Sequence, residues 1–154
     1  TDTIDVELRN QYAPYQVQYS TRMILDHLGY ASSNIAVDSG YYYLAIKHRN
    51  GIQTWSAEPV FVPSSSIYDF TVASSKAYGN NMKEIANHVW GLFSGDFNLD
   101  ENIDLLDLAI LESYIPYFQY GYFETDINGD GNVDLLDVPM VEQNINDFIF
   151  SSHP

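Results

Sequence analysis

The chain has 154 residues, of which 45% are hydrophobic, enough for one medium-sized domain or two small ones with a buried core. Six lysines and arginines stand against 21 aspartates and glutamates, so the net charge is −15 and no basic patch exists to neutralise the phosphates of a nucleic acid. The absence of cysteine excludes disulfides, thiol catalysis and thiolate metal sites.

The negative charge is concentrated in the C-terminal part of the chain. Residues 95–154 contain thirteen carboxylates and no lysine or arginine, whereas residues 1–94 carry eight acidic residues against six basic ones. A segment with this charge repels itself unless it stays unfolded or binds cations. Regularly spaced apolar residues argue against disorder, namely Leu108, Leu111, Ile115, Val141, Ile145 and Phe148. We therefore expect two domains, residues 1–94 and residues 95–154, and expect the second to bind cations.

The first part of the chain is predicted to form β-strands. Apolar and polar residues alternate from Ile4 to Leu8, and Gln16–Leu25 is a second strand-like run. The run Tyr41–Arg49 is followed by Asn50-Gly51 and then by Ile52–Trp55. Because Asn and Gly both tolerate a positive φ, this pattern predicts a β-hairpin with a type I′ turn at Asn50-Gly51.

Shorter strands are expected between this hairpin and residue 94. We predict strands at Val60–Val62, Tyr68–Phe70 and His88–Phe93, a loop at Pro63–Ser66 and a turn at Tyr78–Asn81. Several short strands separated by turn signals are typical of a β-sandwich. The predicted fold of residues 1–94 is therefore an all-β sandwich of the Ig-like or transthyretin-like type.

Two twelve-residue stretches of the C-terminal part repeat one another. Residues 96–107 read DFNLDENIDLLD, and residues 126–137 read DINGDGNVDLLD. Both place oxygen-bearing side chains at positions 1, 3, 5, 9 and 12, the offsets at which an EF-hand loop surrounds Ca²⁺, with a backbone carbonyl at position 7. We expect each loop to bind one Ca²⁺, two in all. The predicted ligands are Asp96, Asn98, Asp100, Asn102, Asp104, Asp107, Asp126, Asn128, Asp130, Asn132, Asp134 and Asp137.

The two loops differ at position 6, where the chain must turn sharply. The second loop has Gly131 there, but the first has Glu101. A non-glycine residue in the left-handed conformation costs about 1 kcal/mol, so the first site is expected to be weaker or slightly distorted. At position 8 both loops have an apolar residue, and we expect Ile103 and Val133 to join the loops through a short β-bridge.

A short helix is predicted after each loop. The first carries Leu108, Leu111 and Ile115 on one face; the second carries Val138, Val141, Ile145 and Phe148 at matching offsets, with Pro139 in its first turn. A strand precedes the first loop and a glycine-containing segment precedes the second. The repeat is therefore loop–helix rather than the helix–loop–helix of an intracellular calcium sensor.

This duplicated loop–helix, with aspartate at position 12 of each loop, resembles the dockerin family of bacterial assembly modules over residues 95–150. The resemblance implies docking to a cohesin domain through positions 10 and 11 of each loop. In this sequence those positions are Leu105-Leu106 and Leu135-Leu136, where Ser/Thr pairs are common in the family. These leucines would form an apolar interface for a partner if they are exposed, or would pack inward or against the β-domain, and the sequence leaves both readings open.

Residues 1–94 are similar to the β-sandwich domain that precedes dockerin-like repeats at the ends of large secreted bacterial surface proteins. The similarity is carried by four segments: Val6–Arg9, Tyr42–Asn50, Ala57–Val60 and Tyr68–Phe70. It implies an extracellular or cell-surface location. The first ten residues are not those of a signal peptide, so we expect any secretory leader to have been removed. No apolar run is long enough for a membrane-spanning helix.

These features predict a non-catalytic assembly protein, for which two modes compete. Copies of the chain would associate into a surface fibre, with the N-terminal strand or the tail residues Phe148 and Phe150 adding to a neighbour, or the module would bind a cohesin-like partner. The sequence slightly favours self-association, because no catalytic module is present as cargo. A third hypothesis is carbohydrate binding through exposed aromatic residues, such as Tyr41–Tyr43, Trp55 and the tyrosines between 114 and 122. Catalysis is not expected, because the carboxylates that would imitate a glycosidase pair belong to the calcium loops.

Overall fold

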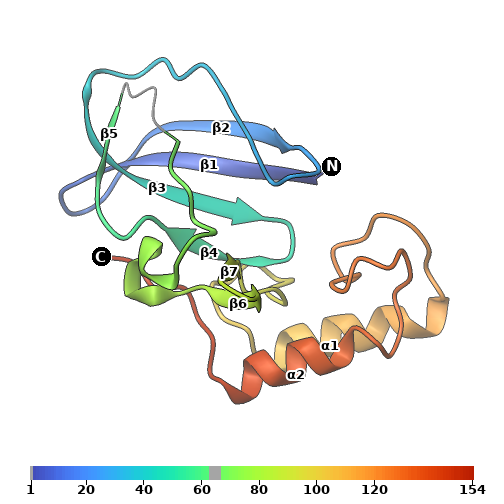
Figure 1. Cartoon of the computed structure of the whole chain (residues 1–154). Helices are drawn as coiled ribbons and strands as arrows, with labels where there is room; N and C mark the ends of the chain where they lie inside the picture. The colour runs from blue at the N-terminus through green and yellow to red at the C-terminus, as the bar shows by residue number, and fades with distance from the viewer. Residues whose placement is uncertain (1, 63–66) are drawn as a thin grey trace. The chain divides into compact units, whose positions relative to one another are not determined.

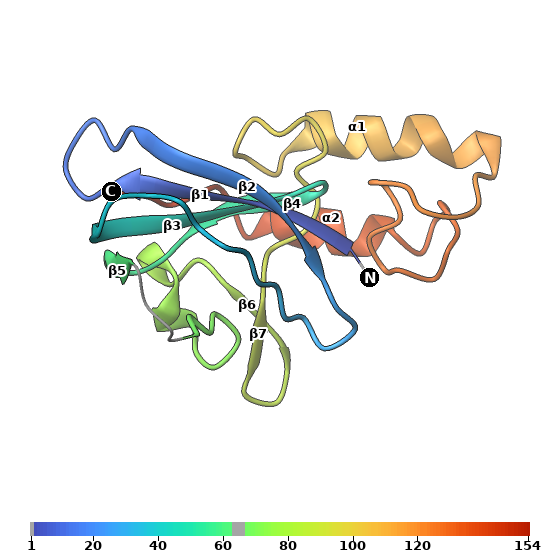
Figure 2. The ribbon, with the colours of Figure 1, turned by 90° about the horizontal axis from the view of Figure 1, so that it is seen from above.

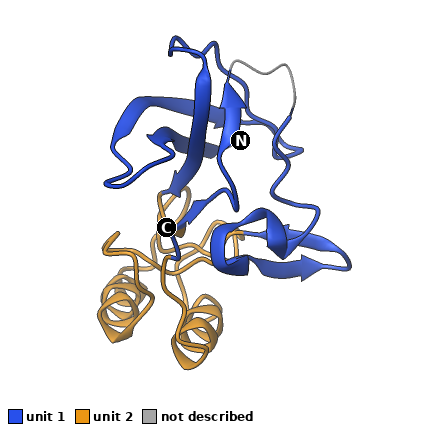
Figure 3. Cartoon of the chain, turned by 90° about the vertical axis from the view of Figure 1, so that its left-hand side faces the viewer, with its two compact units in different colours: residues 1–48, 53–91, 152–154 blue, residues 49–52, 92–151 orange. Residues whose placement is uncertain are grey.

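The computed structural model describes residues 2–62 and 67–154. The chain divides into two units (Figure 3). Unit 1 consists of residues 1–48, 53–91 and 152–154, and unit 2 consists of residues 49–52 and 92–151. Within the described ranges, no helix has the length and apolar character needed to cross a membrane. The domain boundary expected after residue 94 stays a prediction.

A five-stranded sheet organises the N-terminal part of the chain (Figures 1 and 2). Its strands are β1 (Asp2–Asn10), β2 (Val17–Leu25), β3 (Gly40–His48), β4 (Gly51–Trp55) and β5 (Val60–Val62). The strand order is β2-β1-β3-β4, and β5 also pairs with β3. In β1 the period of two buries Ile4, Val6 and Leu8, so the alternation in the sequence predicted this strand correctly.

β1 is an interior strand of this sheet. It pairs antiparallel with β2 on one side, where Ile4 faces Met23, and with β3 on the other, where Ile4 faces His48. Because both edges of β1 are already hydrogen-bonded, the expectation that the N-terminal strand adds to the sheet of a neighbour is wrong. The edge strand next to it is β2.

Two predicted strands differ from the structure. Tyr68–Phe70 is not a strand, because the Asp69 carboxylate accepts hydrogen bonds from the backbone N–H and the hydroxyl of Thr71 and so forms a local turn. The strand expected at His88–Phe93 is the shorter β7 (Val89–Gly91), which pairs with β6 (Lys83–Ala86), a strand that the sequence did not predict. The predicted loop at Pro63–Ser66 lies outside the described residues.

Unit 1 also contains the β6–β7 ribbon and two short 3₁₀ turns. The turns are η1 (Ser74–Lys76) and η2 (Tyr78–Asn80), and the second confirms the turn predicted at Tyr78–Asn81. The described residues therefore form a β-rich unit with one five-stranded and one two-stranded sheet. The Ig-like or transthyretin-like sandwich is not confirmed by this arrangement and stays a prediction.

The predicted hairpin is present, but its turn lies one residue earlier than expected. Arg49 and Asn50 form the turn and Gly51 begins β4. Asn50 and Gly51 are not among the residues with positive φ in the described part of the chain, so the predicted type I′ turn is wrong. The turn residues are instead held by hydrogen bonds to segments of unit 2 that are distant in the sequence.

Unit 2 is built from two helices that run side by side in opposite directions (Figure 1). They are α1 (Leu105–Tyr114), which continues into η3 (Ile115–Tyr117), and α2 (Val138–Asn146), and Figure 3 shows both end-on. Pro139 lies in the first turn of α2, as predicted. The buried core consists of Ile52, Ile103, Leu111, Val133 and Val141, each at most 3% exposed.

The apolar face of α2 ends earlier than the sequence pattern indicated. Val138, Val141 and Ile145 pack into the core, but Phe148 is 81% exposed. The helix ends at Asn146, and Phe148 adopts a φ of 53°, so the chain leaves the helix direction before Phe148 would reach the core face. Phe148 is therefore a surface residue.

A backbone two-fold pseudosymmetry relates the halves of unit 2. The segment after α1 pairs with the second loop through a bridge between Tyr120 and Asn132, and the segment after α2 pairs with the first loop through a bridge between Asn102 and Phe150. The N–H of Ile103 donates to the Ile149 carbonyl, and the equivalent N–H of Val133 donates to the Gln119 carbonyl. The predicted bridge between Ile103 and Val133 is therefore wrong, although both side chains lie in one core.

Candidate metal centre

Each acidic loop is folded around the carboxylates of its first and last positions. In the first loop, Asp96 accepts from the N–H groups of Asp100 and Glu101 at 3.1 and 3.2 Å. Asp107 accepts from Phe97 and Asn98 with one oxygen, at 2.8 and 3.3 Å, and from Asp104 with the other, at 3.0 Å. These bonds close the loop and also begin α1, because Asp104 and Asp107 form a capping box.

The second loop repeats this pattern thirty residues later. Asp126 accepts from the N–H groups of Gly129 and Gly131, at 2.9 and 3.0 Å. Asp137 accepts from Ile127 and Asn128 with one oxygen and from Asp134 with the other. All but one of these hydrogen bonds recur at equal offsets, the exception being that Asp126 accepts from position 4 (Gly129) where Asp96 accepts from position 5 (Asp100). The two stretches therefore fold as closely similar structural units.

The middle positions of both loops are linked in the same way. The Asn98 side-chain carbonyl accepts from the N–H of Asp100, and Asp100 accepts from the N–H of Asn102. In the second loop, Asn128 and Asp130 accept from the residues two positions further on at 2.7 and 2.9 Å. The Asp130 carboxylate accepts from the backbone N–H and the side-chain amide of Asn132, and these bonds hold the pKa of the exposed Asp130 below its usual range. The predicted ligands at positions 3, 5 and 7 thus lie along one tight turn in each loop.

The carboxylates at the first and last positions are buried. Asp96, Asp107, Asp126 and Asp137 are 2%, 0%, 7% and 0% exposed. Burial, together with the negative charge of Asp107, raises the pKa of Asp96 to about 6, and burial also raises the pKa of Asp107. Buried carboxylates are stable only when a counter-charge or a metal ion compensates them.

Unit 2 supplies almost no counter-charge of its own. Arg49 is its single lysine or arginine, and its guanidinium donates to the Phe123 carbonyl and lies 4.1 Å from the centre of the Tyr122 ring. The four buried aspartates are therefore left without a basic partner from residues 92–151. A hard divalent cation that prefers oxygen ligands fits this requirement.

The donor set of each loop consists of oxygen atoms only, as Ca²⁺ requires. Among residues 2–62 and 67–154, no three His, Cys, Asp or Glu side chains are grouped as a metal site. A group of these four residue types would contain only some of the predicted ligands of each loop. The ligand at position 3 is an asparagine in both loops, and the ligand at position 7 is a peptide carbonyl. The twelve ligands therefore stay a prediction, which the chemistry of the donors supports.

The left-handed conformation predicted at Glu101 is confirmed, with a φ of 73°. A second strained position was missed, because Leu99, at position 4, has a φ of 57°. The second loop has glycine at both positions, Gly129 and Gly131, with φ of 73° and 87°. A comparison of position 4 between the two loops is the sequence signal that would have identified Leu99.

The predicted partner-binding leucines lie on the surface. Leu105 and Leu106 are 70% and 61% exposed, and the equivalent Leu135 and Leu136 are 72% and 69% exposed. Of the two readings that the sequence left open, the inward-packed one is therefore excluded. Phe150 is also exposed, at 59%.

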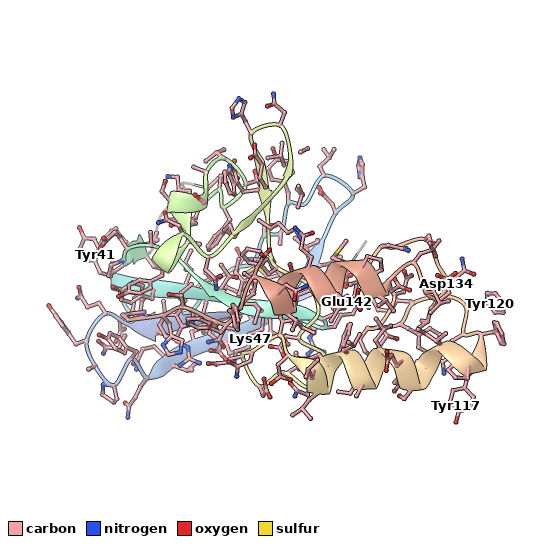
Figure 4. All side chains as sticks on the ribbon, turned by 90° about the horizontal axis from the view of Figure 1, so that it is seen from below. Tyr41, Lys47, Tyr117, Tyr120, Asp134 and Glu142 are labelled. Atoms are coloured by element: carbon pink, nitrogen blue, oxygen red, sulfur yellow. The ribbon has the colours of Figure 1, made fainter. Side chains whose placement is uncertain are left out.

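The aromatic residues considered for sugar stacking fall into two groups. Tyr43 and Trp55 are 8% and 3% exposed, so they belong to the core of unit 1. Tyr117 and Tyr120 are each 75% exposed and lie beyond the end of α1 with their side chains directed outward (Figure 4).

Comparison with known families agrees with the geometry of unit 2. Residues 94–146 match the family model for the dockerin type I domain. The C-terminal module is dockerin-like. Neither the comparison with curated proteins nor the one with solved structures found a match. The β-rich region before the dockerin-like module lies outside the matched residues.

Dockerin domains are calcium-binding, non-catalytic assembly modules with cohesin-like protein partners, and they occur in extracellular and cell-surface proteins. Calcium binding in this family agrees with the repeated acidic loops of the dockerin-like module. The protein partners of the family agree with the exposure of its leucines.

Proposed function

We propose that this chain is a non-catalytic, calcium-stabilised extracellular assembly protein whose dockerin-like module binds a cohesin-like partner. The observation that carries this proposal is the exposure of the same Leu-Leu pair in both repeats, at Leu105-Leu106 and Leu135-Leu136. Large apolar side chains at equivalent exposed positions are typical of a protein interface, because their burial on association is favourable.

The calcium part of the proposal rests on the loops. One Ca²⁺ in each loop would be held by the oxygens of positions 1, 3, 5, 7, 9 and 12 and would neutralise the buried carboxylates, such as Asp96 and Asp107. Since the last position lies in the first turn of α1, as Asp107, and is the N-cap of α2, as Asp137, binding of the ion would stabilise the loop and the start of the helix together. The ion would thereby fix the two leucines at the start of α1 and the two leucines in the turn that leads into α2.

Partner binding is tested by replacing the leucines with aspartate. The variants L105D/L106D and L135D/L136D, and the fourfold variant, are compared with the wild-type chain for binding to immobilised type I and type II cohesin domains in millimolar calcium. We expect the fourfold variant to lose at least tenfold in affinity, because a charged side chain cannot be desolvated in an apolar interface.

Leu28 provides the matched control, since it is 68% exposed but belongs to unit 1. L28D should bind as the wild-type chain does. Equal binding by L28D and the fourfold variant would contradict the assignment of the leucines. Wild-type protein that binds neither class of cohesin in calcium would contradict the partner itself.

Self-association into a fibre is a second candidate function, and the exposure of Phe148 favours it. Phe148 is 81% exposed and Phe150 is 59% exposed at the end of the dockerin-like module, where an apolar contact with another copy would bury both. Light scattering in millimolar calcium and after chelation tests this candidate. Large species that disappear in F148S/F150S would support it, whereas a wild-type monomer at high concentration would contradict it.

Sugar binding, if the chain has this activity, would require the exposed Tyr117 and Tyr120 rather than Trp55. Exposed tyrosines fit a protein interface as well as a sugar ring. The assembly role is therefore the function that the geometry supports best.

A further inference from the structure

The turn between β3 and β4 carries the single basic residue of unit 2. Arg49 and Asn50 belong to this unit by their contacts, although they are far in sequence from the calcium loops. In a unit with thirteen acidic residues, the position of one arginine is informative. Its guanidinium contacts a peptide carbonyl and an aromatic ring, both in the segment that leads into the second loop.

The two turn residues hold the segment that leads into the second loop. The Arg49 guanidinium donates to the Phe123 carbonyl and covers the face of Tyr122 at 4.1 Å. The Asn50 side-chain amide donates to the Glu124 carbonyl at 3.0 Å. Two consecutive carbonyls and the preceding ring are thus fixed immediately before Thr125 and the first ligand position.

Asn50 itself is well suited to a positioning role. It is 5% exposed, and its own carbonyl accepts from the N–H of Gly95 at 2.7 Å. Gly95 directly precedes Asp96. Asn50 therefore forms hydrogen bonds with the segments that precede both loops. The contact to the first loop uses only backbone atoms, whereas the contacts to the second loop use both side chains.

This asymmetry gives the turn a selective role. The start of the first loop is also held by the backbone bridge between Gly51 and Ser94 and by the bond from the Ile52 N–H to the Phe93 carbonyl. The segment before the second loop contains Gly121, with a φ of 108°, and its residues 122–124 are contacted by two side chains of the turn, besides the packing of Phe123 against the core. Removing those side chains would therefore loosen the second loop and spare the first.

We propose that Arg49 and Asn50 are positioning residues for the second calcium loop, holding residues 122–124 so that Asp126 is preorganised to bind Ca²⁺. This inference rests on the proposed calcium function. Preorganisation raises affinity because the ordering of the segment precedes binding of the ion.

The sign of the effect separates positioning from simple electrostatics. If Arg49 acted only as a positive charge in an acidic unit, its removal would strengthen the binding of Ca²⁺, because less positive charge repels the ion. If Arg49 positions the loop, R49A weakens binding. We expect about tenfold weaker binding at the second loop in R49A and in N50A, the size expected for loss of one buried hydrogen bond to a carbonyl.

The two loops can be followed separately by amide NMR during a calcium titration of the full chain. The N–H of Gly131 donates to Asp126, and the equivalent N–H of Glu101 donates to Asp96, so each reports on the first ligand of its own loop. In R49A and N50A we expect the midpoint for Gly131 to move to higher calcium and the midpoint for Glu101 to stay. R49K keeps the charge but loses the planar stacking, and should give an intermediate shift.

Matched controls are available in unit 1. R22A makes the same change of charge at an exposed arginine that pairs with Asp5, and N34A removes an exposed asparagine side chain. Equal midpoints for Gly131 in R49A and R22A, or equal shifts of the Gly131 and Glu101 midpoints in R49A, would overturn the inference. If R49A does not fold, R49K and N50A provide the same comparison. Absence of any calcium-dependent shift in the wild-type chain would instead overturn the proposed calcium function.

Discussion

At the scale of single residues, the two calcium loops differ in backbone strain. Glu101 and Leu99 adopt left-handed conformations at positions where the second loop has glycine. Each such residue with a side chain costs about 1 kcal/mol relative to a conformation without this clash. The first loop is therefore the more strained of two otherwise equivalent structures.

Replacing Glu101 with glycine should relieve this strain. We expect E101G to raise the free energy of unfolding of the calcium-loaded chain by about 1 kcal/mol, measured by urea denaturation followed at 222 nm. E101Q is the control, since it removes the charge but keeps the side chain. If E101Q stabilises the protein as much as E101G, charge rather than backbone strain is the cause.

The buried Asp96 predicts a pH dependence for the calcium-free protein. Burial, with the negative charge of Asp107, raises the pKa of Asp96 to about 6 in the folded chain, above the ordinary value of 3.8. The folded state therefore binds a proton more tightly than the unfolded state, and stability increases as the pH falls through 6 towards 4. The gain is on the order of 1–3 kcal/mol. Circular dichroism at 222 nm of the calcium-free protein at pH 7, 5.5 and 4.5 measures it as helix regained at lower pH, and D96N should remove most of this pH dependence.

At the scale of elements, the apolar spacing of the repeats predicted the helices well. Leu111 and Val141 are both fully buried, and Pro139 lies in the first turn of α2. The strands β1 to β5 were likewise predictable from alternation and from the apolar runs around Asn50-Gly51. In each case the information is local, because a period of 2 or 3.6 residues determines which face is buried.

Contacts between distant segments could not be predicted in the same way. Arg49 and Asn50 meet Phe123 and Glu124 across 74 residues of sequence, and no local pattern connects them. Tyr68–Phe70 has the composition of a strand, but the Asp69 side chain competes for the backbone and forms a turn. The two-fold pairing of residues 119–121 and 149–151 with the loops also depends on the tertiary structure rather than on residue type.

Two leucines on α1, one buried and one exposed, provide a test of its packing. Leu111 is 0% exposed and Leu105 is 70% exposed on the same helix. We expect L111A to lower the free energy of unfolding by about 2–5 kcal/mol, because it leaves a cavity in the core of unit 2. L105A should change it by less than about 0.5 kcal/mol. Urea denaturation in calcium measures both, and similar values for the two variants would contradict the assignment of the buried face.

At the scale of the whole molecule, charge and spectroscopic reporters are distributed unequally between the two units. Unit 2 carries thirteen acidic residues against Arg49, and it contains both α-helices of the described residues. The two tryptophans, Trp55 and Trp90, both belong to unit 1. Helical circular dichroism therefore reports on unit 2, and tryptophan emission reports on unit 1.

Removal of calcium should consequently affect the two signals differently. Without the ion, the buried aspartates of unit 2 are uncompensated and repel one another, so we expect chelation to remove most of the helical signal at 222 nm. The sheet of unit 1 contains no predicted calcium ligand, and Trp55 packs there between Tyr15, Tyr43 and His153, so its emission should stay that of a buried indole. Magnesium, which demands a smaller and stricter octahedral site, should restore the helices less well than calcium when added back.

Helical signal that survives chelation, or is restored equally by both ions, would contradict a calcium-dependent fold of unit 2. A simultaneous loss of buried tryptophan emission would contradict the expected independence of unit 1.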